Sequence, residues 1–341
     1  MTLEKLKRNY LKKKNFLKLI CLLCLLHNFF TSYLLQYKNI PKKFNHIHIA
    51  MSFNNNYTYI IMVSITSILL NAKISTFIHF HFLIGNDVEL INIKKICSIK
   101  KLNSNTIFNF YRVGNTFKGW KHGKQKLTVA SFYRMILGEI INDVNKIIYL
   151  DGDTLIYNDL TEMYDLNMNN LYFRGIHEIL ISKKIAQYKK GKYICAGIML
   201  MNLELIREEH VFTKFKEYYL RFYNQGIYYG DQHIINSLFS DKIGFLPPIY
   251  GMWFINEKSI MEYKELNPLI YTEQELRESQ SKPAIRHIWG DSEEGFLNEK
   301  PWLLLKYFKI KEEWNYYAKK TGYYPSICKF YKNACINIHK I

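Results

Sequence analysis

Apolar residues in the first half of the chain follow two spacings in turn. Short runs rich in Ile, Phe and Tyr predict strands at residues 46–51, 76–84, 106–111 and 146–150. Between these runs, apolar residues recur at helical spacing over residues 57–70, 88–100 and 128–140. Strands that alternate with helices predict an α/β domain with a mainly parallel central sheet.

The second half of the chain is less regular. It carries a strand-like block at residues 193–203 and helical patterns at residues 212–223 and 231–239. Residues 244–248 then lead into an aromatic, irregular region. Because loops on a rigid scaffold commonly carry function, we expect this region to contribute to specificity.

The N-terminal segment combines basic and apolar residues. Residues 1–43 hold ten Lys or Arg and a single acid, Glu4, and residues 16–35 are dominated by Leu, Ile, Phe and Cys. About 20 such residues can span a bilayer, and the absence of a small-residue cleavage site favours an uncleaved anchor. The basic flank then predicts a single-pass type II membrane protein, facing the Golgi or ER lumen in a eukaryote or associated with the cell envelope in a bacterium. The alternative is a helix packed on the membrane surface or on the domain.

Composition limits the remaining classes. The chain has 341 residues, 48% of them hydrophobic and 16% aromatic, which is enough for a sizeable core. The net charge is +18, but about half of it lies in residues 1–43. With no motif that would place basic or aromatic side chains on bases, nucleic acid is not expected as a partner.

We predict three parts: a basic tail and anchor (1–43), a catalytic domain (44–310) and a helical, basic C-terminal extension (311–341).

The strongest chemical signal follows the strand at residues 146–150. Asp151-Gly152-Asp153 comes directly after it, and in an open α/β sheet ligands bind outside the carboxyl ends of the strands. Two carboxylates one residue apart provide the hard oxygen ligands that Mg²⁺ or Mn²⁺ prefers. The alternative is an ordinary turn, since Asp and Gly are common turn residues.

Two pairs of histidines also share strand faces. His46 and His48 lie on one predicted strand, and His79 and His81 on the next. Such pairs can indicate a metal site, but we expect packed or hydrogen-bonded histidines here.

Four separated segments give these signals a common interpretation. They are residues 54–57, residues 149–155, residues 195–203 with 230–232, and residues 287–290 with 300–302. In this order they resemble glycosyltransferase family 8, the retaining, metal-dependent transferases that include lipopolysaccharide galactosyl- and glucosyltransferases and the glycogenins. The resemblance covers about residues 46–305. It implies a Rossmann-like nucleotide-sugar transferase fold of the GT-A type.

The resemblance also implies a reaction and a cofactor. The family transfers a sugar from a nucleotide-activated donor, here a UDP-sugar of glucose, galactose or xylose, to an acceptor hydroxyl on a glycan, lipid-linked or protein acceptor. By resemblance, Asp151, Asp153 and His287 hold Mn²⁺ or Mg²⁺. A bound metal stabilises the charge on the departing diphosphate without moving a proton.

Further site residues are carried over from the family by position. Gln232 resembles the residue on the reacting face of the sugar and Asp231 the one that holds sugar hydroxyls, so both are assigned as catalytic. The residues that resemble donor-binding positions are Asn54, Asn56, Tyr57, Arg134, Gly152, Cys195, Ala196, Gly197, Gly290 and Lys300, together with the two metal-binding aspartates.

Three features depart from the family pattern. Asn54 and Asn55 stand where the family commonly has an acid pair that contacts the base and ribose. Cys195 replaces an Asn or Ser near the sugar, and a thiol is a poor hydrogen-bond partner. Nine residues, 291–299, lie where the family usually has a few, which predicts a longer lid over the diphosphate.

Two other functions are compatible with parts of the pattern. A haloacid-dehalogenase-type phosphatase would use Asp151 as nucleophile and Asp153 as general acid/base, but its motif normally follows the first strand and is accompanied by a later acid pair. A degenerate transferase domain that binds a sugar-nucleotide or glycan without turnover is the non-enzymatic alternative. The intact metal-ligand set argues against it.

Overall fold

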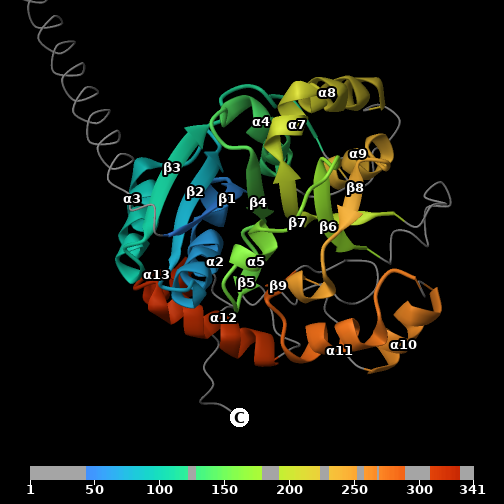
Figure 1. Ribbon diagram of the computed structural model, residues 1–341. Helices are drawn as coiled ribbons and strands as arrows, with labels where there is room; N and C mark the ends of the chain where they lie inside the picture. The colour runs from blue at the N-terminus through green and yellow to red at the C-terminus, as the bar shows by residue number, and fades with distance from the viewer. Residues whose placement is uncertain are drawn as a thin grey trace, which may run out of the picture. The chain divides into compact units, whose positions relative to one another are not determined.

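The computed structural model describes residues 44–121, 128–178, 192–222, 230–251, 257–266, 269–288 and 308–330. Their central feature is a seven-stranded sheet with strand order β3-β2-β1-β4-β7-β6-β8 (Figure 1). Its strands are β1 (Asn45–Phe53), β2 (Thr76–Ile84), β3 (Thr106–Arg112), β4 (Lys146–Leu150), β6 (Phe173–His177), β7 (Ile194–Asn202) and β8 (Ile243–Phe245). β7 runs antiparallel to β4 and β6, while the other pairings are parallel. The predicted α/β class and mainly parallel sheet are therefore confirmed.

A second, two-stranded sheet carries part of the site. It consists of β5 (Thr154–Ile156) and β9 (Ile285–His287), which pair antiparallel so that His287 lies opposite Thr154. Only residues 151–153 separate the end of β4 from the start of β5, so the chain passes directly from the large sheet to the small one.

Helices surround the sheets (Figure 1). In the first half they are η1 (Asn55–Tyr57), α2 (Thr58–Asn71), α3 (Leu90–Ser98), η2 (Ile99–Leu102), η3 (Val129–Ile136), α4 (Leu137–Ile140) and α5 (Thr161–Tyr164). In the second half they are α7 (Leu203–Glu208), α8 (Val211–Phe222), α9 (Gly230–Leu238), η5 (Pro248–Tyr250), α10 (Glu257–Leu266), α11 (Glu273–Ser281), α12 (Phe308–Lys320) and α13 (Tyr324–Phe330).

Helix α2 is buried almost all round, as its nearly continuous apolar sequence requires. Two of its serines bond to β5: Ser67 Oγ accepts a hydrogen bond from the Ile156 N–H at 3.0 Å, and Ser64 Oγ lies 3.0 Å from Thr154 Oγ1. Both contacts hold β5 against α2. Helix α2 of the domain core therefore holds the small sheet in place.

The C-terminal helices pack on the same part of the domain. Trp314 and Tyr317 of α12 and Ile327 of α13 form a buried cluster with Ile60 and Val63 of α2, Leu155 of β5 and Ile288. Figure 1 shows α12 running beneath α2 and β5. The described part of the predicted C-terminal extension is thus helical and contributes to the core beside the small sheet.

The four histidines lie together on adjacent strands. His46 Nδ1 is 3.0 Å from His79 Nε2, and His48 Nδ1 is 3.0 Å from His81 Nε2. The rings of His48 and His79 stack with centroids 4.5 Å apart. The prediction that these residues are packed and hydrogen-bonded is confirmed, and we call them the histidine cluster.

Some elements differ from the sequence-based predictions. The helix predicted at residues 128–140 is a 3₁₀-helix over most of its length, η3, followed by the single turn α4. Apolar spacing does not distinguish the two forms here, because residues 132–137 are all buried. Strands β5, β6, β8 and β9 were not predicted; each has only three to five residues and no clear alternating pattern.

The predicted membrane anchor at residues 16–35 lies outside the described residues. In the part of the chain that the structure does describe, none of the helices combines the length and apolar character needed to cross a bilayer. The membrane location therefore stays a prediction.

Candidate active site

The Asp151-Gly152-Asp153 segment forms a fixed turn between β4 and β5. The Asp151 N–H donates to Gly197 O at 2.8 Å, which continues the β4–β7 pairing by one residue. Thr154 Oγ1 donates to Asp151 O at 2.9 Å and closes the turn. A Cβ at Gly152 would lie 3.1 Å from Tyr57 Cδ1, so the turn packs closely on the tyrosine ring.

Three side chains converge at this turn. His287 Nε2 lies 3.2 Å from Asp153 Oδ1 and 3.8 Å from Asp151 Oδ2. One potential ligand atom from each of the three residues lies within 4.8 Å of the others. Within the described ranges no other group of three or more His, Cys, Asp or Glu side chains meets this criterion. Two carboxylates and an imidazole are a suitable donor set for Mn²⁺ or Mg²⁺.

A glycine makes this convergence possible. A Cβ on Gly197 would lie 2.3 Å from His287 Cε1 and 2.8 Å from Asp151 Oδ2. Any larger residue would collide with two of the three predicted ligands. The predicted role of this Ala-Gly segment near the sugar stays a prediction, but the need for glycine comes directly from the geometry.

The titratable groups at the turn shift one another's pKa values. Burial favours the neutral form of His287, but its hydrogen bond to Asp153 and its contact with Cys195 outweigh burial and raise its pKa well above the usual value. Burial raises the pKa of Asp151, although the Arg134 guanidinium opposes this effect. A metal ion bound by these three groups would compete with protons for them.

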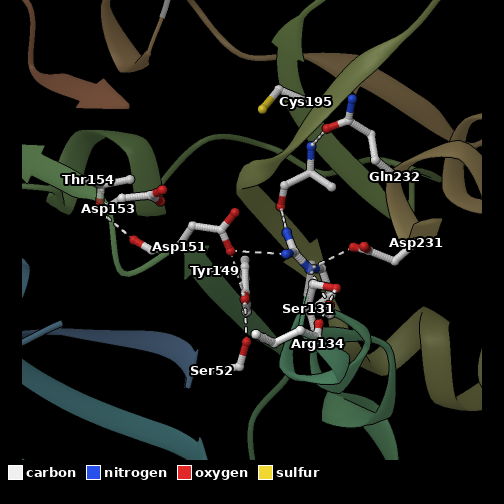
Figure 2. A network of polar contacts seen from close by, with 12 residues as sticks. Ser52, Ser131, Arg134, Tyr149, Asp151, Asp153, Thr154, Cys195, Asp231 and Gln232 are labelled. Carbon is white, nitrogen blue, oxygen red and sulfur yellow. Dashed lines mark hydrogen bonds and ion pairs between the residues drawn. The ribbon is translucent and has the colours of Figure 1, made fainter. Parts of the chain in front are cut away.

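Arg134 lies between two carboxylates in the interior, as Figure 2 shows. Only 3% of its surface is exposed. Nη2 donates to Asp151 Oδ1 at 3.0 Å, Nε lies 2.9 Å from Asp231 Oδ2, and Nη1 donates to Ala196 O. Burial opposes its charge, but Asp151 and Asp231 raise its pKa above the ordinary value. Its predicted contact with the donor stays a prediction; the observed contacts neutralise and fix the two acids.

Tyr149 and Ser52 support Asp151 from below, and sequence reasoning did not single them out. Tyr149 is fully buried, and its hydroxyl donates to Asp151 Oδ1 at 3.0 Å. Since a tyrosine has one O–H, the 2.6 Å contact with Ser52 Oγ is donated by the serine (Figure 2). Tyr149 could have been predicted from its position two residues before Asp151, because residues two apart on a strand share a face.

The two predicted catalytic residues begin α9. Gly230 starts the helix with φ +57°, Asp231 follows with 3% exposure, and Gln232 Oε1 accepts a hydrogen bond from the Ala196 N–H at 2.9 Å. Gln232 therefore contacts Ala196 of β7 directly, and Asp231 contacts Arg134, which itself bonds to Ala196. Cys195, the residue before Ala196 on β7, places Sγ 3.7 Å from His287 Nδ1.

The end of β1 completes the described part of the site. Asn54 Oδ1 accepts from the Tyr57 N–H at 3.2 Å and caps η1, while the Tyr57 hydroxyl donates to Asp153 Oδ2 at 3.1 Å. Asn56 is exposed. Asp87, which was not predicted, accepts from the Asn55 N–H at 3.0 Å. The β1 loop is thus linked directly to a predicted metal ligand.

The structure brings most of the predicted residues together. Figure 2 shows Arg134 between Asp151 of the turn and Asp231 of α9. Tyr57 of η1 and His287 of β9 both contact Asp153. Gly290 and Lys300, predicted to contact the diphosphate, lie outside the described residues, as does the predicted lid at 291–299.

Comparisons with known proteins agree with this geometry. The family profile for Glycosyl transferase family 8 matches residues 48–303. A putative glycosyltransferase of Haemophilus influenzae is 28% identical over 208 residues, which cover 59% of this chain and 61% of that protein. Glycosyltransferase GlyE of Streptococcus pneumoniae is 24% identical over 241 residues, which cover 66% of this chain and 53% of that protein. The chain thus matches less than two thirds of the length of these relatives.

A solved structure shares the fold. The galactosyltransferase LgtC, crystallised with donor and acceptor sugar analogs, aligns with a TM-score of 0.63 at 20% identity, over 81% of this chain and 95% of LgtC. This likeness shows that the GT-A-type fold predicted from the sequence is correct. Because the family profile also spans most of the sequence, the chain belongs to glycosyltransferase family 8.

Proposed function

We propose that this protein transfers a sugar from a UDP-sugar to an acceptor hydroxyl, with retention of configuration and in dependence on Mn²⁺ or Mg²⁺. The observation that carries the proposal is the convergence of Asp151, Asp153 and His287 within 4.8 Å at the carboxyl end of β4. Glucose, galactose and xylose are the proposed sugars, and a glycan, lipid-linked or protein hydroxyl is the proposed acceptor. The likeness to LgtC, which was crystallised with donor and acceptor sugar analogs, supports this substrate class.

The residues around the turn have separable tasks in this proposal. A divalent ion held by Asp151, Asp153 and His287 would act as a Lewis acid toward the departing nucleoside diphosphate. Arg134 and Tyr149 both hold Asp151 Oδ1, which leaves Oδ2 on the side of His287. The orientation of this carboxylate is thus set before any ligand arrives, so little reorganisation is needed on binding.

The start of α9 provides the sugar-facing groups. Asp231 pairs with Arg134 Nε at 2.9 Å, and its carboxylate oxygens can also accept hydrogen bonds from sugar hydroxyls. The oxygen of Gln232 is held by the Ala196 N–H, which fixes the position of the whole amide. We propose that these two side chains orient the sugar at its reacting carbon.

The phosphatase alternative is not favoured by the structure. It would require Asp151 to attack phosphate, but Asp151 follows β4 in the family 8 fold rather than a first strand, and Arg134 and Tyr149 occupy one of its oxygens. A degenerate domain that binds a sugar-nucleotide without turnover remains the alternative that the following experiment decides.

The test is UDP release by the full-length protein from UDP-glucose, UDP-galactose, UDP-xylose and UDP-N-acetylglucosamine, with Mn²⁺ or with EDTA. We expect Mn²⁺-dependent release from one donor, and loss of that release in Asp153→Asn. Asp143→Asn is the matched control, because Asp143 is exposed before β4 and away from the turn. Retention is checked by NMR of the anomeric configuration of the product. Donor binding without release under every condition would instead support the degenerate domain.

A further inference from the structure

Strand β7 is irregular at the point where it meets the site. In the pairing with β6, Gly175 lies opposite Met199, but the next residue, Ile176, lies opposite Cys195. Residues 196–198 therefore fall outside the β6 ladder, while β4 still pairs with Ile198. A bulge of this kind bends a strand and changes where its side chains point, and bulges are frequent beside active sites.

Three successive residues of β7, at the irregularity and just before it, contact the predicted site. Ala196 uses its N–H for Gln232 and its carbonyl for Arg134. Gly197 leaves the space that His287 and Asp151 fill. Cys195, the paired residue just before the irregular segment, directs its sulfur at the imidazole of His287. The thiol therefore faces a predicted metal ligand.

The two nitrogens of His287 have different surroundings. Nε2 faces Asp153 Oδ1 at 3.2 Å and Asp151 Oδ2 at 3.8 Å, so it is the nitrogen on the metal side. Nδ1 points the other way and lies 3.7 Å from Cys195 Sγ. When Nε2 binds a metal, the ring's remaining hydrogen must be on Nδ1. The cysteine sulfur lies within reach as an acceptor for that N–H.

We propose that Cys195 is a positioning residue for the metal site: its sulfur accepts the Nδ1–H of His287 and holds the ring with Nε2 toward Asp151 and Asp153. This inference rests on the proposed function. It differs from the sequence-based prediction, in which Cys195 contacts the donor sugar. A partner on the second nitrogen fixes both the tautomer and the rotation of a ligand histidine, and loss of such a partner typically weakens metal binding by about 10- to 100-fold.

The test measures binding of Mn²⁺ alone, from the EPR signal of free Mn²⁺, to the full-length protein without nucleotide. We expect Cys195→Ala to raise the Kd for Mn²⁺ by about 10- to 100-fold. Cys195→Ser should lose less, because a hydroxyl also accepts a hydrogen bond. Cys97→Ala is the matched control, since Cys97 is a free, exposed cysteine on α3, and its Kd should equal that of the wild type.

A second readout separates positioning from sugar contact. With saturating Mn²⁺, Cys195→Ala should regain a near-normal KM for the UDP-sugar, because only the metal site is weakened. Unchanged Mn²⁺ affinity in Cys195→Ala would overturn the proposal, and a raised donor KM with unchanged Mn²⁺ affinity would restore the sugar-contact interpretation. Asp153→Asn distinguishes a failure of the Cys195 proposal from a failure of the proposed function. If this variant binds Mn²⁺ as well as the wild type does, the metal site is wrong and both proposals are contradicted.

Discussion

The buried guanidinium of Arg134 gives the sharpest prediction about stability. Its side chain is 4% exposed and pairs with Asp151 at 3.0 Å and with Asp231 at 2.9 Å. Replacement by Met keeps much of the apolar stem but leaves the Asp231 carboxylate, itself 4% exposed, without its cation. Removal of one partner from a buried pair costs about 3–5 kcal/mol. Asp151 is 28% exposed and should contribute less to this loss, because water partly solvates it.

The assay is equilibrium unfolding in urea at pH 7 in metal-free buffer. We expect Arg134→Met to lower the free energy of unfolding by about 3–5 kcal/mol, whereas Arg221→Met, at an exposed position on α8, should stay within about 0.5 kcal/mol of the wild type. The double variant Arg134→Met, Asp231→Asn removes the orphaned charge and should recover at least about 1 kcal/mol relative to the single variant. A loss below about 1 kcal/mol in Arg134→Met, or no recovery in the double variant, would refute this account of the ion pairs.

Three further predictions concern the predicted metal site, the support of the small sheet, and the histidine cluster. Gly197→Ala adds a Cβ 2.3 Å from the imidazole of His287, a predicted metal ligand. Mn²⁺ binding measured by EPR should therefore fall at least about tenfold, while far-UV circular dichroism is unchanged. Normal binding would show that the predicted ligands rearrange freely. Glu313 of α12 accepts hydrogen bonds from Tyr157 at 2.6 Å and Arg286 at 3.2 Å. Glu313→Gln should therefore lower the free energy of unfolding in urea by about 1–3 kcal/mol, whereas Glu312→Gln, at the exposed neighbouring position, should leave it almost unchanged. Equal effects of the two variants would show that α12 does not support the small sheet. Burial, with neighbouring imidazoles, lowers the pKa of three members of the histidine cluster to about 3, below the value of about 6.5 in an unfolded chain. The unfolded state therefore binds more protons, and stability is lost as pH falls from about 6.5 toward 3, with a slope of up to about 1.4 kcal/mol per pH unit for each histidine. The double variant His79→Gln, His81→Gln should flatten that slope in urea unfolding between pH 7 and 4.5, and an unaltered slope would contradict the assignment.

The fold was largely predictable because its first half follows simple periodicities. The strand at residues 76–84 and the strand at residues 146–150 have the bounds of β2 and β4. Position along the strand also predicted the place of Asp151, since the carboxyl ends of parallel strands form the binding edge of such a sheet. These features depend on local sequence, which a single chain displays directly.

Other features depend on contacts between distant segments. β9 is three residues long and pairs with β5 about 130 positions earlier, so no local pattern identifies it. The antiparallel direction of β7 follows from its neighbours in space. The burial of Arg134 between two acids, like the contact of Cys195 with His287, depends on where η3 and β7 cross the site.

The central claim is that Asp151, Asp153 and His287 form a metal site for transfer from a UDP-sugar. The most direct measurement is UDP release from the four UDP-sugars by wild-type protein and by Asp153→Asn, with Mn²⁺ and with EDTA. The account predicts release from one donor only when both Mn²⁺ and Asp153 are present. Equal release in EDTA, or full activity of Asp153→Asn, would contradict it.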